Sequence, residues 1–374
     1  MIEKASALFS VYVLDGIQQE LTPARLLEAV SEEGVLCGGQ DDTPVVVVDE
    51  TIESVGRSVV PVSEDPFPFL GKMSGDMDRF PLSYAEAYTR MRAGSALVDA
   101  LWKKGKFTVG DLSLEVRWKI NGDMVGCMAA FYHSVQAASE YVDALGLKFS
   151  GCEVERADSP DVEFTAVLSN IPEAEEDTFV VEPFRTHNPW MTQERICQAE
   201  LVPDPKSWVV YIPFDTADFR LGGSAFATAA GVAGAPPRIE DADYFMDCFE
   251  VIREFAEDGI LLSAATVGRG GLLKAVSDMA EGSGCGMEIN VSDIMRAYQE
   301  SSSFAVVFSE IPGALIQIRD SDFDYVDAEL LLQDVAYYPL GHPVEGAGLS
   351  VCSAKRPGIE TILDSLMQNA EGED

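Results

Sequence analysis

The residues best suited to chemistry form the short run Gly268-Arg269-Gly270-Gly271, which follows a predicted strand and opens a predicted helix. Backbone N–H groups at a helix N-terminus, together with an arginine, can hold a phosphate or another anion. The alternative is a tight strand-to-helix turn with a solvated Arg269. We take the anion site as a hypothesis, because arginine is scarce in so acidic a chain.

Histidine and cysteine offer little further material for a site. The three histidines stand alone in the sequence, which disfavours a histidine metal cluster or a Ser-His-Asp triad. The seven cysteines are scattered without a C-x-x-C pair, which argues against a disulfide framework and a structural zinc site. Cys152 and Cys285 lie at glycine turns with no neighbouring base or cation, so we expect structural roles for both.

Three other side chains could be functional. Glu310 lies in a Ser-Glu-Ile-Pro-Gly turn and could supply a functional carboxylate. His133 follows Tyr132 within a predicted helix and is expected to be packed or hydrogen-bonded. Trp190, close to His187, could be a contact residue.

The composition describes a folded, strongly acidic protein. Among 374 residues, 63 Asp and Glu oppose 26 Lys and Arg, giving a formal charge of −37, while 47% of residues are apolar. The electrostatic field of this negative charge repels nucleic-acid phosphates, so nucleic acid is not an expected partner. No window approaches 18 uninterrupted apolar residues and the N-terminus has no basic region before its apolar run, so we expect neither a membrane span nor a signal peptide. We therefore expect a cytoplasmic protein.

The alternation of predicted helices and strands implies an α/β or α+β fold, and the length suggests two domains or one large one. In the first half, strands are predicted at 7–14, 44–50 and 162–169, helices at 22–30, 83–103 and 123–145, and a loop at 61–82. In the second half, strands are predicted at 207–214, 260–266, 286–291 and 313–319, and helices at 227–234, 241–258, 272–282 and 292–300. The proline-rich, acidic stretch between the halves reads as a linker. The expected division is an N-terminal domain at 1–170, a linker at 171–206, a C-terminal domain at 207–348 and a tail at 349–374.

The run from Gly259 to Ile318 resembles the aminoimidazole ribonucleotide synthetase superfamily, and within it the phosphoribosylformylglycinamidine synthases. The matching elements are the helix Leu272–Glu281, the turn Gly284-Cys285-Gly286, the turn from Ser309 to Gly313 and the small-residue turn Gly222-Gly223-Ser224-Ala225. The similarity extends over roughly residues 40–345. It implies an N-terminal domain whose strands close a barrel across two repeats, followed by a C-terminal α+β domain.

The resemblance also implies ATP and Mg²⁺, but three motifs depart from the family. Where the family has a magnesium-binding glutamate this chain has Ser95, and Asp99 stands in place of an asparagine. The family's lysine-containing loop becomes 150–154, with Glu153, and its acidic turn becomes 266–271, with no carboxylate. Magnesium prefers carboxylate oxygens, so we expect that both cofactors are lost. The resemblance leaves Ser95, Asp99 and 268–271 as remnants of a nucleotide site, with no catalytic or metal-binding residue.

The leading hypothesis is a catalytically silent repeat that supports a synthase of purine biosynthesis. The alternatives are a divergent ATP-dependent ligase or kinase with relocated ligands, and a stand-alone acidic binding protein that reuses the scaffold. The expected partner is a second copy or a homologous synthase repeat, because the run 44–50 would otherwise present a bare hydrophobic edge strand.

Overall fold

Strand β4 (Leu112–Ile120) is the centre of the N-terminal sheet. From Leu114 to Ile120 every second residue is buried, as expected of a strand covered on one face. It pairs in parallel with β5 (Phe149–Arg156) and antiparallel with β6 (Asp161–Leu168), so the order is β5-β4-β6. The opposite face is charged and carries cross-strand ion pairs between Arg117 and Glu153 and between Lys119 and Glu163.

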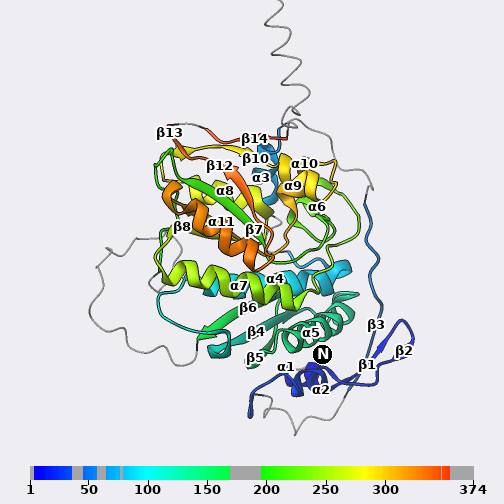
Figure 1. Cartoon of the computed structure of the whole chain (residues 1–374). Helices are drawn as coiled ribbons and strands as arrows, with labels where there is room; N and C mark the ends of the chain where they lie inside the picture. The colour runs from blue at the N-terminus through cyan, green and yellow to red at the C-terminus, as the bar shows by residue number, and fades with distance from the viewer. Residues whose placement is uncertain are drawn as a thin grey trace, which may run out of the picture.

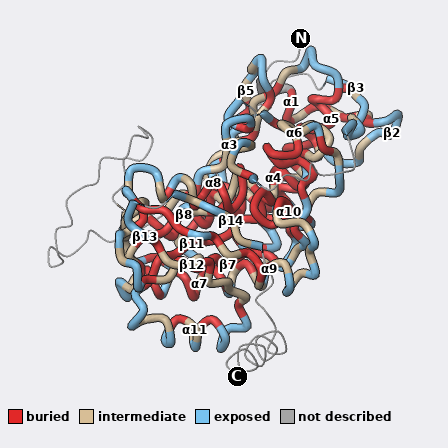
Figure 2. Tube along the Cα trace, turned by 90° about the horizontal axis from the view of Figure 1, so that it is seen from above, coloured by how far each residue is buried: buried red, intermediate tan, exposed pale blue. Residues whose placement is uncertain are grey.

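The computed structural model describes residues 4–35, 45–56, 65–75, 79–168, 195–346 and 348–353. These residues form two lobes, which Figure 1 shows one above the other and Figure 2 shows from above with their buried interiors. A single hydrophobic cluster runs through both lobes. Among the described residues, no helix combines the length and the apolar character needed to cross a membrane.

Two long helices cover the inner face of the N-terminal sheet: α4 (Ala85–Ala100) and α5 (Cys127–Ala144). Buried hydroxyls connect these layers, because Ser134 Oγ lies 2.7 Å from Thr89 Oγ1 and accepts a 2.9 Å hydrogen bond from Trp118 Nε1. Most α4 residues are buried around the whole circumference, which is typical of a helix enclosed on several sides.

A second, smaller sheet in the order β2-β1-β3 lies beside α5. Its region contains α1 (Lys4–Phe9), β1 (Val11–Leu14), β2 (Ile17–Gln18), α2 (Pro23–Glu28) and β3 (Val46–Asp49). Helix α2 begins as predicted, with the Thr22 hydroxyl as its N-cap. The strand predicted at 7–14 is wrong in its first part, since α1 extends to Phe9, because a short apolar run does not distinguish a helix from a strand.

The C-terminal lobe is built on an antiparallel sheet in the order β12-β7-β11-β8. Its strands are β7 (Trp208–Pro213), β8 (Leu261–Val267), β11 (Gly313–Ile318) and β12 (Tyr338–Gly341), and its short pairs are β9 (Cys285–Gly286) with β13 (Val344–Glu345) and β10 (Glu288–Asn290) with β14 (Ser350–Cys352). Its helices are α6 (Ala225–Ala230), α7 (Ala242–Glu257), α8 (Gly271–Ala280), α9 (Ser292–Ala297), α10 (Ser303–Phe308) and α11 (Phe323–Leu332). Three short 3-10 helices lie at Leu82–Tyr84, Val109–Asp111 and Asp320–Asp322.

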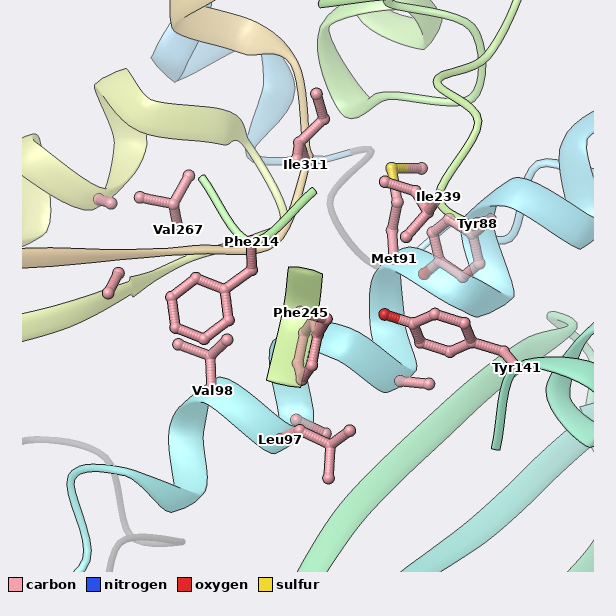
Figure 3. Packing of buried hydrophobic residues seen from close by; sticks show 14 of the residues in the cluster. Tyr88, Met91, Leu97, Val98, Tyr141, Phe214, Ile239, Phe245, Val267 and Ile311 are labelled. Carbon is pink, nitrogen blue, oxygen red and sulfur yellow. The ribbon is translucent and has the colours of Figure 1, made fainter. Parts of the chain in front are cut away.

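Helix α4 connects the lobes. Figure 3 shows Leu97 and Val98 of α4 near Phe214 and Phe245 of the C-terminal lobe, and Tyr141 of α5 on the opposite side of Phe245 from Phe214. All five side chains are almost completely buried. The position of α4 is therefore fixed by apolar packing on both lobes, which allows its polar residues to be placed accurately against the C-terminal turns.

Two segments that were predicted as a loop and a linker have described parts that pack against the C-terminal lobe. The loop expected at 61–82 contains α3 (Phe67–Met73), and its Phe69 packs against Phe226 of the C-terminal lobe with ring centroids 5.1 Å apart. The described part of the predicted linker, 195–206, is held against the C-terminal sheet by Gln317, whose amide bonds both backbone groups of Val202 at 2.8 Å. Residues 171–194 lie outside the described part of the chain. No closed barrel is formed by the described strands, and barrel closure with a second repeat stays a prediction.

Candidate functional site

The first element of the candidate site is a close approach of α4 to two C-terminal turns. A Cβ atom built on Gly268 would lie 2.8 Å from Ser95 Oγ, and one built on Gly94 would lie 2.8 Å from Pro312 Cγ. Both distances are too short for a real Cβ atom, so the small residues are required for this contact. The two lobes therefore meet at nearly backbone distance beside Ser95.

One helical turn further along α4, Asp99 bonds to the last part of β8. The Thr266 hydroxyl donates to the Asp99 carboxylate, and Trp102 Nε1 donates to the same hydroxyl oxygen at 2.9 Å. The indole fixes the hydroxyl orientation, so that its proton points at Asp99. This chain of three side chains again joins α4 to the C-terminal lobe.

The Asp99 carboxylate keeps solvent-accessible area, yet protein surrounds it on many sides. This desolvation raises the pKa of the Asp99 carboxyl above its usual value, while the Thr266 hydrogen bond and the nearby cations Arg195, Arg92 and Lys103 lower it. Burial also lowers the pKa of Lys103, whose ammonium group donates to Ala166 O at 2.6 Å. Asp99 is therefore an accessible acid whose charged form is disfavoured by desolvation and only partly stabilised by its neighbours.

The Gly268–Gly271 turn is occupied by an internal anion. Glu310 Oε1 accepts hydrogen bonds from Gly270 N at 2.9 Å and from Ala225 N at 2.8 Å, and Glu310 Oε2 accepts from Arg269 Nη1 at 2.7 Å. The side chains of Arg269 and Glu310 are only 6% and 2% exposed. The alternative of a solvated Arg269 is wrong, and an external anion would have to compete with this buried carboxylate.

Arg269 also bridges the two lobes. Its guanidinium donates to Gly223 O at 3.0 Å and to Arg79 O at 3.1 Å. Its Cζ atom lies 4.8 Å from the centroid of the Tyr88 ring, in the geometry of a cation–π contact. Tyr88 belongs to α4, so the ion pair with Glu310 is linked directly to the helix that carries Ser95 and Asp99.

Gly270 and Gly271 both have backbone conformations that require glycine, and Gly271 also lacks room for a side chain. Both residues have positive φ angles, of 87° and 74°, which side chains rarely tolerate. A Cβ atom on Gly271 would also lie 2.7 Å from Val307 O. The turn is thus shaped by backbone geometry, and this shape aims Gly270 N at the Glu310 carboxylate.

A cavity of about 410 Å³ lies between the lobes, and neither Arg269 nor Glu310 lines it. Arg79 and Gly223, whose carbonyls accept from Arg269, both line it. Apolar walls come from Ile52 and Phe80, and polar groups from Tyr84, Asp158 and several hydroxyls. The lining of this cavity is therefore mixed in polarity.

The structure brings together all the residues that the sequence proposed for the site. Ser95 contacts Gly268, Asp99 bonds to Thr266, and Arg269 and Gly270 share Glu310. Sequence reasoning missed Thr266 and Tyr88 as partners, and no local pattern could have paired them with residues on distant elements. Whether an external ligand binds these residues stays a prediction.

Other predicted residues lie elsewhere. The loop expected at 150–154 is wrong, since these residues belong to β5, and Glu153 points to the charged face of the sheet. His133 is packed as expected, with Nδ1 3.6 Å from Glu86. Burial raises the pKa of the Cys152 thiol to about 12, which disfavours the nucleophilic form. His187 and Trp190 lie outside the described residues.

The residues at this site do not fit Mg²⁺ or a metal-bound nucleotide. Ser95 offers a single hydroxyl in place of a carboxylate, and Asp99 is engaged by Thr266 and surrounded by three cations. Within the described ranges, no group of three or more His, Cys, Asp and Glu side chains is placed to hold a metal ion. The side chains at this site therefore do not supply the oxygen ligands that a magnesium-dependent reaction would need.

Comparison with known proteins assigns the C-terminal lobe to a family. Residues 216–351 match the family described as AIR synthase related protein, C-terminal domain. These residues therefore belong to the AIR synthase-related family. The resemblance and the mixed α/β fold class predicted from the sequence are confirmed.

The chain is also similar to much longer proteins. It is 29% identical over 159 residues to phosphoribosylformylglycinamidine synthase of Drosophila melanogaster, covering 40% of this chain and 12% of that protein. The human protein of the same name is 26% identical over 125 residues, covering 33% of this chain and 9% of that protein. The chain thus spans about a tenth of the length of the curated relatives it matches.

A solved structure extends the fold likeness beyond the C-terminal lobe. The structure of Thermotoga maritima PurL complexed with FGAR superposes with a TM-score of 0.52 at 12% sequence identity. The match covers 74% of this chain and 42% of that chain. At this identity the comparison supports a shared fold.

Proposed function

We propose that this chain is a catalytically silent relative of phosphoribosylformylglycinamidine synthase that acts in purine biosynthesis by pairing with a homologous repeat. The partner would be a second copy or a catalytic synthase repeat. We expect the protein to act in the cytoplasm, without nucleic acid or membrane partners, in keeping with its charge of −37. The proposal extends from the family assignment of residues 216–351.

The observation that carries the proposal is the Glu310 carboxylate at the Arg269–Gly270 turn. The resemblance assigns this turn to a nucleotide site, yet its guanidinium and one of its backbone N–H groups bind an internal carboxylate that is almost completely buried. At the same time, Ser95 replaces the metal ligand and is packed against Gly268. Phosphoryl transfer needs positive charge to neutralise the developing charge on phosphate, and here that charge is already neutralised.

One observation favours the rival hypothesis of a divergent ligase or kinase. Asp99 is accessible, its pKa is raised by desolvation, and it accepts a hydrogen bond from a hydroxyl that Trp102 orients. Perturbed carboxyls in clefts are candidates for acid–base chemistry. The third hypothesis, a stand-alone acidic binding protein, has only the net charge in its favour.

The deciding experiment measures ADP release from ATP with formylglycinamide ribonucleotide, ammonia and Mg²⁺. We expect no turnover above a blank without protein, under conditions where an authentic synthase is active. Asp99→Ala and an exposed control on α7, Asp247→Asn, are assayed alongside. Turnover that Asp99→Ala abolishes and Asp247→Asn retains would overturn catalytic silence and support the divergent enzyme.

A further inference from the structure

We propose that Arg269, Gly270 N and Ala225 N form a binding site for a small monocarboxylate, and that the Glu310 side chain is its resident, intramolecular ligand. The three donors come from two separate chain segments and converge on one carboxylate at 2.7–2.9 Å. This inference goes beyond the proposed function, because it does not depend on whether the protein turns over ATP.

The donors are fixed by the surrounding backbone and not by Glu310 alone. Gly270 N is aimed by a left-handed backbone with φ of 87°. Arg269 is held by two carbonyls, Gly223 O and Arg79 O, and by the Tyr88 ring. A site whose donors are held independently keeps its shape when the ligand is changed, as a preorganised oxyanion site does.

Charge balance selects the class of ligand. The buried guanidinium carries one positive charge, and the Glu310 carboxylate neutralises it with one negative charge. A buried charge without a partner is strongly unfavourable. A monoanion therefore satisfies this site, whereas a phosphate dianion would leave an uncompensated negative charge inside a protein of net charge −37. Formate and acetate present the same pair of oxygens as the Glu310 side chain.

The interlobe cavity lies next to two residues that hold the arginine of this site. Arg79 and Gly223 line this cavity of about 410 Å³ and also contact Arg269 directly. In the wild-type protein Glu310 fills the site, and its neighbours Ile311 and Pro312 are buried, so the carboxylate is held in place. The site opens to an external ligand only when the Glu310 side chain is shortened.

Chemical rescue of Glu310→Ala tests this proposal. We expect the variant to unfold about 10 °C below the wild type, because Arg269 is left buried without its carboxylate. Sodium formate should then restore at least half of this difference in a saturable manner, and acetate should restore less because of its methyl group. Sodium chloride at the same ionic strength should not restore the unfolding temperature of Glu310→Ala. None of these salts should raise the unfolding temperature of the wild type in this saturable manner.

Two matched variants separate a specific site from general salt effects. Glu310→Gln fills the same space without the charge, so it should be destabilised and not rescued by formate. The double variant Arg269→Ala/Glu310→Ala should also show no rescue. Equal effects of formate and chloride, or rescue that persists without Arg269, would overturn the proposal. If Glu310→Ala is recovered only as aggregate, refolding from urea in formate or in chloride serves instead, and equal yields would overturn the proposal.

Discussion

Ser95 and Gly268 touch across the junction of the two lobes, where a Cβ atom on the glycine would stand 2.8 Å from the serine hydroxyl. The family resemblance places a magnesium-binding glutamate at position 95. Ser95 stands in place of that ligand, and its small side chain permits the contact with Gly268. The replacement is therefore more than a missing carboxylate, because the packing of α4 against β8 now depends on a small side chain.

Restoring the glutamate should not restore the chemistry. We expect Ser95→Glu to lower the free energy of unfolding by about 1–3 kcal/mol, because the added atoms have to displace the Gly268 backbone. We also expect no Mg²⁺-dependent ATP turnover, since Glu310 still occupies Arg269. Urea unfolding and an ADP-release assay measure the two effects. Ser95→Ala is the control, with a change below about 1 kcal/mol. Turnover in Ser95→Glu would show that a single ligand separates this chain from an enzyme.

Asp99 should make stability depend on pH. Its folded pKa is raised above the unfolded value by desolvation, so the folded state binds the proton more tightly. The stabilisation that this carboxyl gives is complete below the unfolded pKa of about 3.9 and is lost as the pH rises through the raised, folded pKa. Asp99→Asn keeps an acceptor for the Thr266 hydroxyl but cannot ionise. We therefore expect the variant to gain stability relative to the wild type as the pH rises from about 4 towards neutrality.

Urea titrations at several pH values follow this difference directly. Asp247→Asn removes one negative charge from an exposed position on α7, and so controls for the general effect of reducing the charge of −37. An equal pH dependence for both variants would mean that the effect belongs to the net charge and not to the surroundings of Asp99.

Local backbone requirements made part of the site predictable. Glycines at 268, 270 and 271 between a strand and a helix indicate a tight turn, and the observed φ angles at 270 and 271 explain two of them. Capping residues likewise placed the start of α2 correctly, because the Thr22 hydroxyl acts within one turn of the chain. Such signals need only the nearest neighbours in sequence.

Contacts between residues far apart in the chain could not be predicted from the sequence. Glu310 lies 40 positions from Gly270, and nothing in either turn indicates that one supplies the anion for the other. The resemblance implies a loop at 150–154, whereas pairing with β4 makes these residues part of strand β5. Helix α3 lies in a stretch rich in Pro, Gly and Asp, and is stabilised by aromatic packing of Phe69 on the other lobe.

A second internal carboxylate should contribute strongly to stability. Asp49, at the end of β3, accepts hydrogen bonds from the backbone N–H groups of Gly126, Met128 and Ala129 at 2.9, 2.9 and 3.1 Å. It thereby caps α5 and attaches the small sheet to the rest of the lobe. We expect Asp49→Ala to lower the free energy of unfolding by about 2–3 kcal/mol, more than an ordinary cap, because three charge-assisted bonds are lost.

Denaturant unfolding checks this value, with Asp123→Ala as its control. Asp123 carries the same charge near the same helix, but among the described residues its carboxylate forms an ion pair with the half-exposed Arg156 alone. An exposed ion pair contributes up to about 1 kcal/mol, so the control should change little. Equal losses in the two variants would contradict the capping role of Asp49.

Pairing with a second chain should depend on β3. Among the described residues, β3 pairs with β1 and with no other strand, and Val46 and Val48 are 61% and 71% exposed while Val47 is 4% exposed. An apolar edge of this kind is a template for another strand.

Near 0.15 M salt, where charges are screened beyond about 8 Å, we expect light scattering to give twice the 40.5 kDa chain mass. Val46→Lys/Val48→Lys should be monomeric, because lysines on an edge strand oppose pairing. Leu331→Lys/Leu332→Lys adds the same charges at exposed positions of α11 and should remain dimeric. A wild-type monomer throughout the micromolar range would rule out self-pairing, and a monomeric α11 variant would place the contact elsewhere.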